Sequence, residues 1–173
     1  KGLCGRVLVI GGSASMPGAP MLSGFAALRT GSGLVNIARL SSWSGVSAPA
    51  ELVFLNIEGD EAAYSMSHLG VIEPAISKAD CIIIGPGMGL SPLTKTFLLE
   101  LLSYSSGKKI PSVVDADALT LFQESLENDV GKEILSCSVI TPHPGEAARL
   151  LGQNVVDIQA DRYRSARLLY EKT

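Results

Sequence analysis

Residues 81–92, with the sequence CIIIGPGMGLSP, decide the fold class of this 173-residue chain. The four apolar residues Cys81–Ile84 do not alternate with polar ones, which is typical of a strand buried on both faces of a parallel sheet. Three glycines among the next five residues predict a loop. Ser91 and Pro92 then provide an N-cap and a first-turn residue for a helix. The segment therefore predicts a β-loop-α unit.

The same pattern recurs on both sides of this segment. We expect strands at residues 6–10, 34–38, 52–57, 112–114 and 138–141, and helices at 21–29, 69–79, 91–104, from about 118, at 147–151 and at 161–172. Repeated units of this kind build a mainly parallel sheet with right-handed crossovers. We therefore predict an α/β fold with helices on both faces of the sheet, in three layers (α/β/α). Helical spacing predicts two apolar faces: in the first helix Leu22, Phe25, Ala26 and Leu28, and in the last Tyr163, Ala166, Leu169 and Tyr170.

Charge and composition exclude several classes of protein. Fourteen basic and seventeen acidic residues give a net charge of −3 without long runs of like charge, which argues against a general nucleic-acid binder. No apolar run is long enough to cross a bilayer, and the first residues do not resemble a signal peptide. Cys4, Cys81 and Cys137 lack paired spacing, so we expect buried free thiols and a cytoplasmic protein.

The loops that follow the strands are the candidate ligand site. In a parallel sheet, ligands bind at the edge formed by the carboxyl ends of the strands, here called the rim. The glycines of residues 85–89 allow a ligand close to the backbone, although a tight turn needs the same residues. Residues 11–20 (GGSASMPGAP) leave room for a flat ligand or form a plain turn. We expect both loops to meet at the rim.

Acidic residues and one histidine add chemistry to these loops. Asp115 and Asp117 either cap the next helix or contact a substrate hydroxyl or hydrated magnesium. His143 lies between two prolines, and Glu146 falls in the first turn of a helix. The pair either packs and caps, or His143 contacts substrate while Glu146 organises magnesium or water near phosphate. His68, in a polar stretch, is predicted to be a surface residue without a role.

In their order along the chain, these segments resemble the NAD(P)H-hydrate dehydratase family. The resemblance rests on residues 1–2 (KG), 5–7 (GRV), 11–13 (GGS), 16–19 (MPGA), 26–33 (AALRTGSG), 49–52 (PAEL), 85–89 (GPGMG), 114–119 (VDADAL) and 141–146 (TPHPGE). Each segment is modest alone, but the ordered set is highly specific. The family has the ribokinase-like fold, which agrees with the predicted parallel sheet.

The resemblance implies an activity and its participants. The family uses ADP or ATP as a cosubstrate, with Mg²⁺, to dehydrate (S)-NAD(P)H-hydrate back to NAD(P)H. The nucleotide phosphorylates the hydroxyl on the nicotinamide ring, and elimination of phosphate restores the cofactor. Family members commonly form tetramers, and some are fused to, or work with, an NAD(P)H-hydrate epimerase.

The resemblance also implies roles for particular residues. It places Ala19, Gly87, Asp115 and His143 against the substrate. Asp117 and Glu146 are expected near the nucleotide phosphates or magnesium, and no residue is assigned as a metal ligand.

The chain departs from the family pattern in one respect. The glycine-rich G-T-G-D element, which supplies the catalytic aspartate, and the K-G-x-x-T strand are absent from it. We therefore interpret residues 1–173 as the N-terminal portion of a single dehydratase domain, assign no catalytic residue, and expect no activity from this portion alone. Two alternatives stay open: another ribokinase-like kinase, acting on hydroxymethylpyrimidine or thiazole, and a non-catalytic nucleotide-binding remnant.

Overall fold

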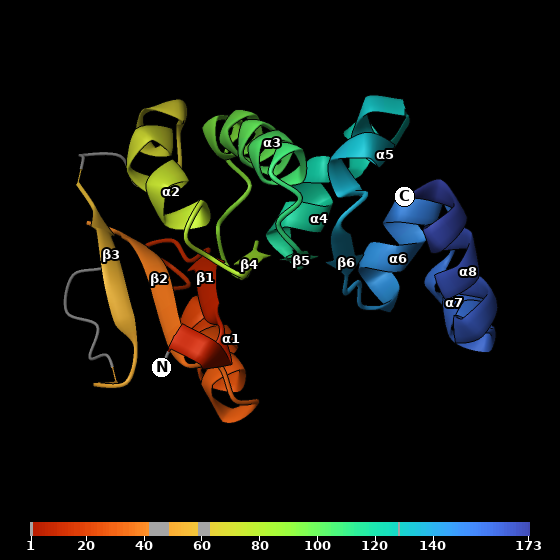
Figure 1. Ribbon diagram of the computed structural model, residues 1–173. Coiled ribbons are helices and arrows are strands. Elements are labelled where there is room, and N and C mark those ends of the chain that lie inside the picture. Colours follow the sequence, from red (N-terminus) through yellow and green to blue (C-terminus); the bar gives the residue numbers. More distant parts are fainter. Residues whose placement is uncertain (1, 42–48, 59–62, 128) are drawn as a thin grey trace.

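Within the part of the chain that the structure describes, six strands form a single sheet with the order β3-β2-β1-β4-β5-β6 (Figure 1). The strands are β1 (Arg6–Ile10), β2 (Leu34–Leu40), β3 (Val53–Ile57), β4 (Cys81–Ile84), β5 (Ser112–Val114) and β6 (Ser138–Ile140). This computed structural model describes residues 2–41, 49–58, 63–127 and 129–173. All five strand pairings are parallel, so the predicted parallel sheet is confirmed.

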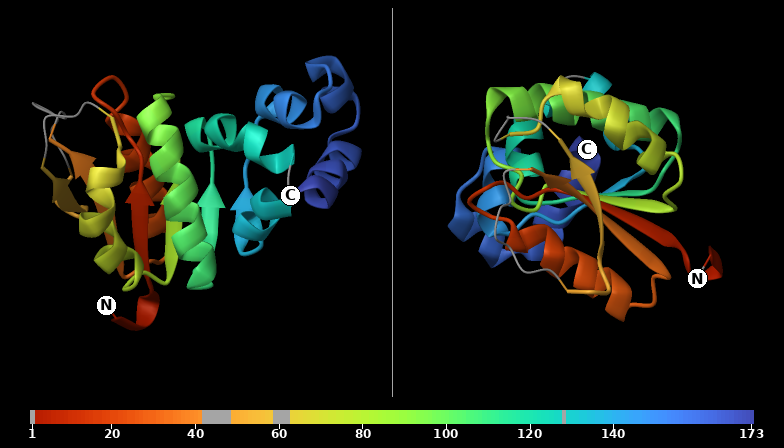
Figure 2. Two further views of the ribbon diagram at one scale, coloured as in Figure 1. Left: turned by 90° about the horizontal axis from the view of Figure 1, so that it is seen from above. Right: turned by 90° about the vertical axis from the view of Figure 1, so that its left-hand side faces the viewer.

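Helices cover both faces of the sheet. They are α1 (Gly18–Arg29), α2 (Leu69–Ile76), α3 (Pro92–Gly107), α4 (Asp117–Phe122), α5 (Asp129–Leu135), α6 (Pro144–Leu151), α7 (Val155–Ala160) and α8 (Arg162–Lys172), with 3-10 turns η1 (Gly2–Cys4), η2 (Met66–His68) and η3 (Gln123–Glu127). Figure 2 shows α1 on one face and α2 and α3 on the other, which confirms the three layers. The helices α6, α7 and α8 gather at the β6 end of the sheet (Figure 1).

The core lies between the sheet and these helices. In β1, the side chains of Leu8, Val9 and Ile10 are at most 1% exposed. Burial of such a side chain contributes about 1.5–3 kcal/mol. Gly24 of α1 lies so close to β2 that an added Cβ would be 3.2 Å from the Cδ1 atom of Ile37. The small residue therefore sets how closely α1 packs on the sheet.

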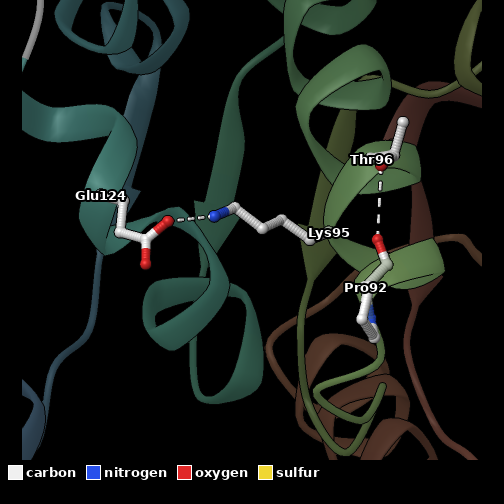
Figure 3. Close-up of polar contacts among 4 residues, drawn as sticks. All are labelled: Pro92, Lys95, Thr96 and Glu124. Carbon is white, nitrogen blue, oxygen red and sulfur yellow. Dashed lines mark hydrogen bonds and ion pairs between the residues drawn. The ribbon is translucent and has the colours of Figure 1, made fainter.

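The start of α3 confirms the predicted cap. The Ser91 hydroxyl accepts a hydrogen bond from the Leu93 amide at 3.3 Å, and Pro92 occupies the first turn. One turn further, Lys95 forms an ion pair with Glu124 of η3 (Figure 3). Both the hydrogen bond to Lys95 and its positive charge lower the pKa of the Glu124 carboxyl. Because Glu124 is exposed, the pair orients α3 and η3 but adds little to stability.

Several predicted orientations are wrong. Leu22 is 73% exposed, and Tyr163 and Tyr170 of α8 are 93% and 83% exposed. Of the predicted apolar face of α8, Leu169 is buried, together with Ser165, because the face that α8 turns inward packs on α6 rather than on the sheet. From the apolar spacing alone, either of two neighbouring faces of α8 could point inward. The position of α6 decides which of them is buried.

His68 is also not the surface residue that was predicted. It is only 3% exposed, its Nδ1 atom accepts a hydrogen bond from the Ser65 amide at 3.1 Å, and its ring packs edge-on against Tyr64. The polar sequence around it suggested exposure. The 3-10 turn η2 folds the histidine back over the segment instead.

The cysteines only partly match the prediction. All three are free thiols, but Cys4 is exposed, whereas Cys81 and Cys137 are partly buried. Burial raises the pKa of the Cys81 thiol. In the part of the chain that the structure describes, no helix combines the length and apolar character needed to span a membrane.

Candidate functional site

The loops after β1 and β4 are held together by their backbones. The Gly12 amide donates a hydrogen bond to the Pro86 carbonyl at 2.8 Å, and the Gly85 amide donates to the Ile10 carbonyl at 3.0 Å. A Cβ atom at Gly11 would lie 2.5 Å from the Pro86 oxygen, so a larger residue would push the loops apart. The glycines at the ends of these strands therefore permit contact between two loops that are distant in sequence.

Gly87 contacts the start of α1, where Ala19 lies. Its φ angle of +67° falls in the left-handed region that favours glycine. An added Cβ would be 2.9 Å from the Met16 carbonyl oxygen and 3.1 Å from the Ala19 Cβ. The structure thus brings together Ala19 and Gly87, two residues predicted from separate loops.

The loop after β5 joins the same group. The Asp115 carbonyl lies so close to Gly85 that an added Cβ there would be 1.9 Å from its oxygen. The Asp117 carboxylate accepts a hydrogen bond from the Gly89 amide at 2.9 Å. Asp117 therefore links the loops after β4 and β5. The Asp115 carboxylate is half-buried, and it has no hydrogen-bond or ion-pair partner among the residues that the structure describes.

The backbone between these two aspartates is strained. Ala116 has φ +53° and ψ −122°, a conformation that residues with a Cβ rarely adopt. Such a residue costs about 1–3 kcal/mol, and residues of this kind cluster at ligand-binding and active sites. The strain at Ala116 therefore supports a ligand role for this loop.

His143 and Glu146 form a reciprocal cap at the start of α6. Glu146 Oε2 accepts from the His143 amide at 2.8 Å, and His143 Nδ1 accepts from the Gly145 amide at 3.0 Å. This acceptor role leaves the ring proton on Nε2, which lies 3.2 Å from Glu146 Oε1. The capping interpretation is therefore what the structure shows. Because 62% of the His143 side chain stays exposed, the imidazole face remains open to a ligand.

The loop after β6 begins beside the loop after β5. The Thr141 amide donates to the Val114 carbonyl at 3.3 Å, so the loop that carries His143 starts beside the end of β5. All six predicted site residues thus follow neighbouring parallel strands: Ala19 after β1, Gly87 after β4, Asp115 and Asp117 after β5, and His143 and Glu146 after β6. Direct contacts join the first three loops. A cavity of about 490 Å³ touches the fourth loop through Pro142 and Pro144, but Gly87, Asp115 and His143 do not line it.

Sequence reasoning missed Tyr64 as part of this arrangement. Its side chain is fully buried, and its hydroxyl lies 2.7 Å from the Gly11 carbonyl and 3.0 Å from the Ala38 carbonyl. Burial raises the pKa of the Tyr64 phenol far above its ordinary value. The ring stacks on Phe97 of α3 with centroids 5.2 Å apart. The only signal in the sequence was a single aromatic residue in a polar stretch.

The parallel sheet covered by helices on both faces, together with the contacts between the loops at its rim, defines an α/β protein of the ribokinase-like class. A solved ribokinase-like superfamily protein from Enterococcus faecalis V583 superposes with a TM-score of 0.74 at 25% identity, over 95% of this chain and 55% of that chain. A structure from Streptococcus mutans superposes with a TM-score of 0.62 at 23% identity, over 90% of this chain and 52% of that chain. The predicted ribokinase-like fold is confirmed.

Residues 7–173 match the NAD(P)H-hydrate dehydratase family, and the chain belongs to this family. The bifunctional NAD(P)H-hydrate repair enzyme Nnr of Moorella thermoacetica is 38% identical over 172 residues, which cover 96% of this chain and 31% of that protein. The Nnr enzyme of Escherichia coli K12 is 34% identical over 174 residues, which cover 99% of this chain and 30% of that protein. The chain thus spans less than a third of the length of these relatives.

Proposed function

We propose that this protein acts in nicotinamide nucleotide repair, in the ADP- or ATP-dependent dehydration of (S)-NAD(P)H-hydrate to NAD(P)H. The observation that carries the proposal is the contact of the loops after β1, β4 and β5 in a chain that belongs to the dehydratase family. These loops place two small residues and two carboxylates at one rim, as a flat dinucleotide with hydroxyl groups requires.

Each predicted substrate contact has a distinct chemical task. Ala19 and Gly87 pack directly against each other, so their two loops meet without a large side chain between them, and a planar ring would approach the backbone there from outside this contact. The Asp115 carboxylate has both oxygens free among the described residues, so it can accept a hydrogen bond from the ring hydroxyl. His143 offers an exposed imidazole face whose orientation Glu146 fixes through the cap. Phosphorylation of the hydroxyl on the nicotinamide ring turns a poor leaving group into a good one.

The acidic residues fit magnesium only in a limited way. In both Asp117 and Glu146, one carboxylate oxygen already accepts a hydrogen bond from a backbone amide. Among the described residues, no three His, Cys, Asp or Glu side chains form a cluster that could hold a metal ion. Mg²⁺ binds through one or two carboxylates, retained waters and substrate phosphates, so Asp115 is the residue that could face a hydrated ion carried by the nucleotide. Asp117 would then add negative charge nearby without direct contact.

We further propose that residues 1–173 are the N-terminal portion of a single dehydratase domain. The comparison with the Enterococcus faecalis protein supports this. The matched region takes up 95% of this chain but only 55% of that protein. We place the protein in the cytoplasm, where its free thiols would stay reduced. Assembly into a tetramer, and cooperation with an epimerase, are part of the same proposal.

A titration of the isotopically labelled chain with hydrated NADPH tests the proposal. We expect the amide resonances of Gly87, Asp115 and His143 to shift, while Gly152 at the far end of α6 stays unchanged. Asp115→Asn should weaken binding about 10-fold, the effect of losing one charge-assisted hydrogen bond. Asp157→Asn, on the exposed surface of α7, is the matched control.

The same titration separates the alternatives. A hydroxymethylpyrimidine or thiazole alcohol that shifts these amides, where hydrated NADPH does not, would favour the vitamin kinase interpretation. Shifts with ATP alone would favour a nucleotide-binding remnant. Dehydration in the complete Moorella thermoacetica relative, followed by the absorbance of the restored dihydronicotinamide, then tests the reaction itself.

A further inference from the structure

The hydroxyl of Tyr64 contacts the start of the first loop of the rim. It donates a hydrogen bond to the Gly11 carbonyl at 2.7 Å and lies 3.0 Å from the Ala38 carbonyl of β2. Gly11 directly follows β1 and opens the loop that leads to Ala19. Burial raises the pKa of the phenol, so its hydroxyl keeps the proton that it donates. Tyr64 is therefore a fixed anchor for the start of this loop.

The other side of Tyr64 packs on the helix that follows the loop after β4. Its ring stacks on Phe97 with centroids 5.2 Å apart and planes 19° from parallel. The Thr94 hydroxyl donates to the Tyr64 backbone carbonyl at 3.4 Å. Both Thr94 and Phe97 are completely buried in α3, which begins at Pro92, just after the glycine-rich loop of residues 85–89. Tyr64 thus connects the loop after β1 with the helix that carries on from the loop after β4.

These two loops touch at the rim through small groups only. The Gly12 amide donates to the Pro86 carbonyl, and an added Cβ at Gly87 would be 3.1 Å from the Ala19 Cβ. Among the residues that the structure describes, no side-chain hydrogen bond runs directly from one loop to the other. The buried contacts of Tyr64 supply a side-chain connection between them.

We propose that Tyr64 is a positioning residue, which sets the distance between Ala19 and Gly87 and, through this distance, the affinity of the rim for the dinucleotide. The claim about affinity rests on the proposed function, whereas the claim about distance rests only on the contacts of Tyr64. Because its side chain is fully buried, Tyr64 acts through the Gly11 carbonyl and through α3, without touching a ligand. A misplacement of about 1 Å, caused by a change far from the chemistry, can slow a reaction about 100-fold, so a buried anchor can control a site that it does not touch.

NMR of the ligand-free chain tests the distance. Tyr64→Phe removes the hydroxyl and keeps the stacked ring, whereas Phe97→Leu keeps the hydroxyl and removes the stack. We expect both variants to shift the amide resonance of Gly87, although Gly87 lies in a different loop from Gly11. Tyr104→Phe is the matched control, because it removes a hydroxyl from the opposite end of α3, where its partner is Ser77 at 3.0 Å. This control should leave the Gly87 resonance unchanged.

A titration with hydrated NADPH tests the affinity. Tyr64→Phe should raise the Kd about 10-fold, and Tyr104→Phe should not change it. Ile158→Val, at a buried position in α7, lowers stability away from the rim and should also leave the Kd unchanged when all proteins are fully folded. The double variant of Tyr64→Phe and Phe97→Leu should lose less affinity than the two single losses multiplied, because both changes break one connection.

Three outcomes would overturn the proposal. An unshifted Gly87 amide in folded Tyr64→Phe would show that the two loops keep their distance without the hydroxyl, whether or not Phe97→Leu folds. An unchanged Kd in Tyr64→Phe would remove its effect on binding. Equal rises of the Kd in Tyr64→Phe and Ile158→Val would mean that general stability is responsible. If the unaltered chain does not bind hydrated NADPH, the proposed function fails, and the Gly87 resonance still decides whether Tyr64 sets the distance.

Discussion

The carboxylate of Asp117 accepts a hydrogen bond from the amide of Gly89 at 2.9 Å, across two loops that follow neighbouring strands. Asp117 is the first residue of α4, a position where a carboxylate commonly stabilises the start of its own helix. Here its Oδ2 atom instead holds the loop after β4, where Gly89 has a φ angle of +84°. One side chain thus fixes the relative position of two parts of the rim.

Replacement of Asp117 tests this link. Asp117→Ala should lower the free energy of unfolding by about 1–3 kcal/mol, because the Gly89 amide loses its partner. Asp117→Asn keeps an oxygen at the same place and should lose less than half as much. Urea denaturation measures both values. Equal losses for the two variants would show that charge, and not the hydrogen bond to Gly89, is what matters.

Gly87 should be sensitive through its contact with the start of α1. Gly87→Ala places a Cβ 2.9 Å from the Met16 carbonyl oxygen in a backbone with positive φ. Gly152→Ala, at φ +65° with no atom near its Cβ, carries the same backbone strain without the contact. We expect Gly152→Ala to cost about 1 kcal/mol and Gly87→Ala about 1–3 kcal/mol more, the range for overpacking. Thermal or urea unfolding gives the difference, and no difference would contradict the close approach.

Gly85 is predicted to tolerate substitution poorly. An added Cβ would lie 1.9 Å from the Asp115 carbonyl oxygen, and both atoms belong to the framework of the rim. Gly85→Ala should cost about 3–5 kcal/mol, a loss that marks disrupted backbone packing. Gly70→Ala in α2, with open space around its Cβ, should instead be neutral or stabilise by up to about 1 kcal/mol. The yields of folded protein and the unfolding curves of the two variants measure these effects, and equal stabilities would contradict the prediction.

The sequence predicted the sheet well because each buried strand is a local signal. Residues 81–92 contain an apolar strand, a glycine loop and a helix cap, and all three are found where they were expected. The convergence of Gly87 and Asp117 at the rim followed from topology, since parallel strands end on one side. The contact between the Tyr64 hydroxyl and the Gly11 carbonyl could not be predicted from local sequence, because 53 residues separate the two. The inward face of α8 likewise depends on α6, which the apolar pattern of α8 does not encode.

Tyr64 offers the sharpest test of long-range organisation in this fold. Tyr64→Phe removes the hydroxyl that lies between the Gly11 and Ala38 carbonyls and leaves both oxygens buried without this donor. We expect a loss of about 1–3 kcal/mol in the free energy of unfolding at neutral pH. The amide resonances of Gly11 and Gly12 should shift, because the first loop of the rim loses an anchor. Tyr163→Phe, which removes an exposed hydroxyl, should change neither quantity.

The pH dependence of the same variant has a definite sign. Burial holds the pKa of the Tyr64 phenol well above its ordinary value of about 10. Below that pH the phenol is protonated in both states, so its full contribution to stability is present. Above it the unfolded chain releases the proton while the folded chain retains it, so stability falls by up to about 1.4 kcal/mol per pH unit. Tyr64→Phe lacks this loss, and the stability difference between the two proteins should shrink as the pH rises above 10. A difference that stays constant up to pH 12 would show that the phenol ionises in the folded protein as readily as in the unfolded one.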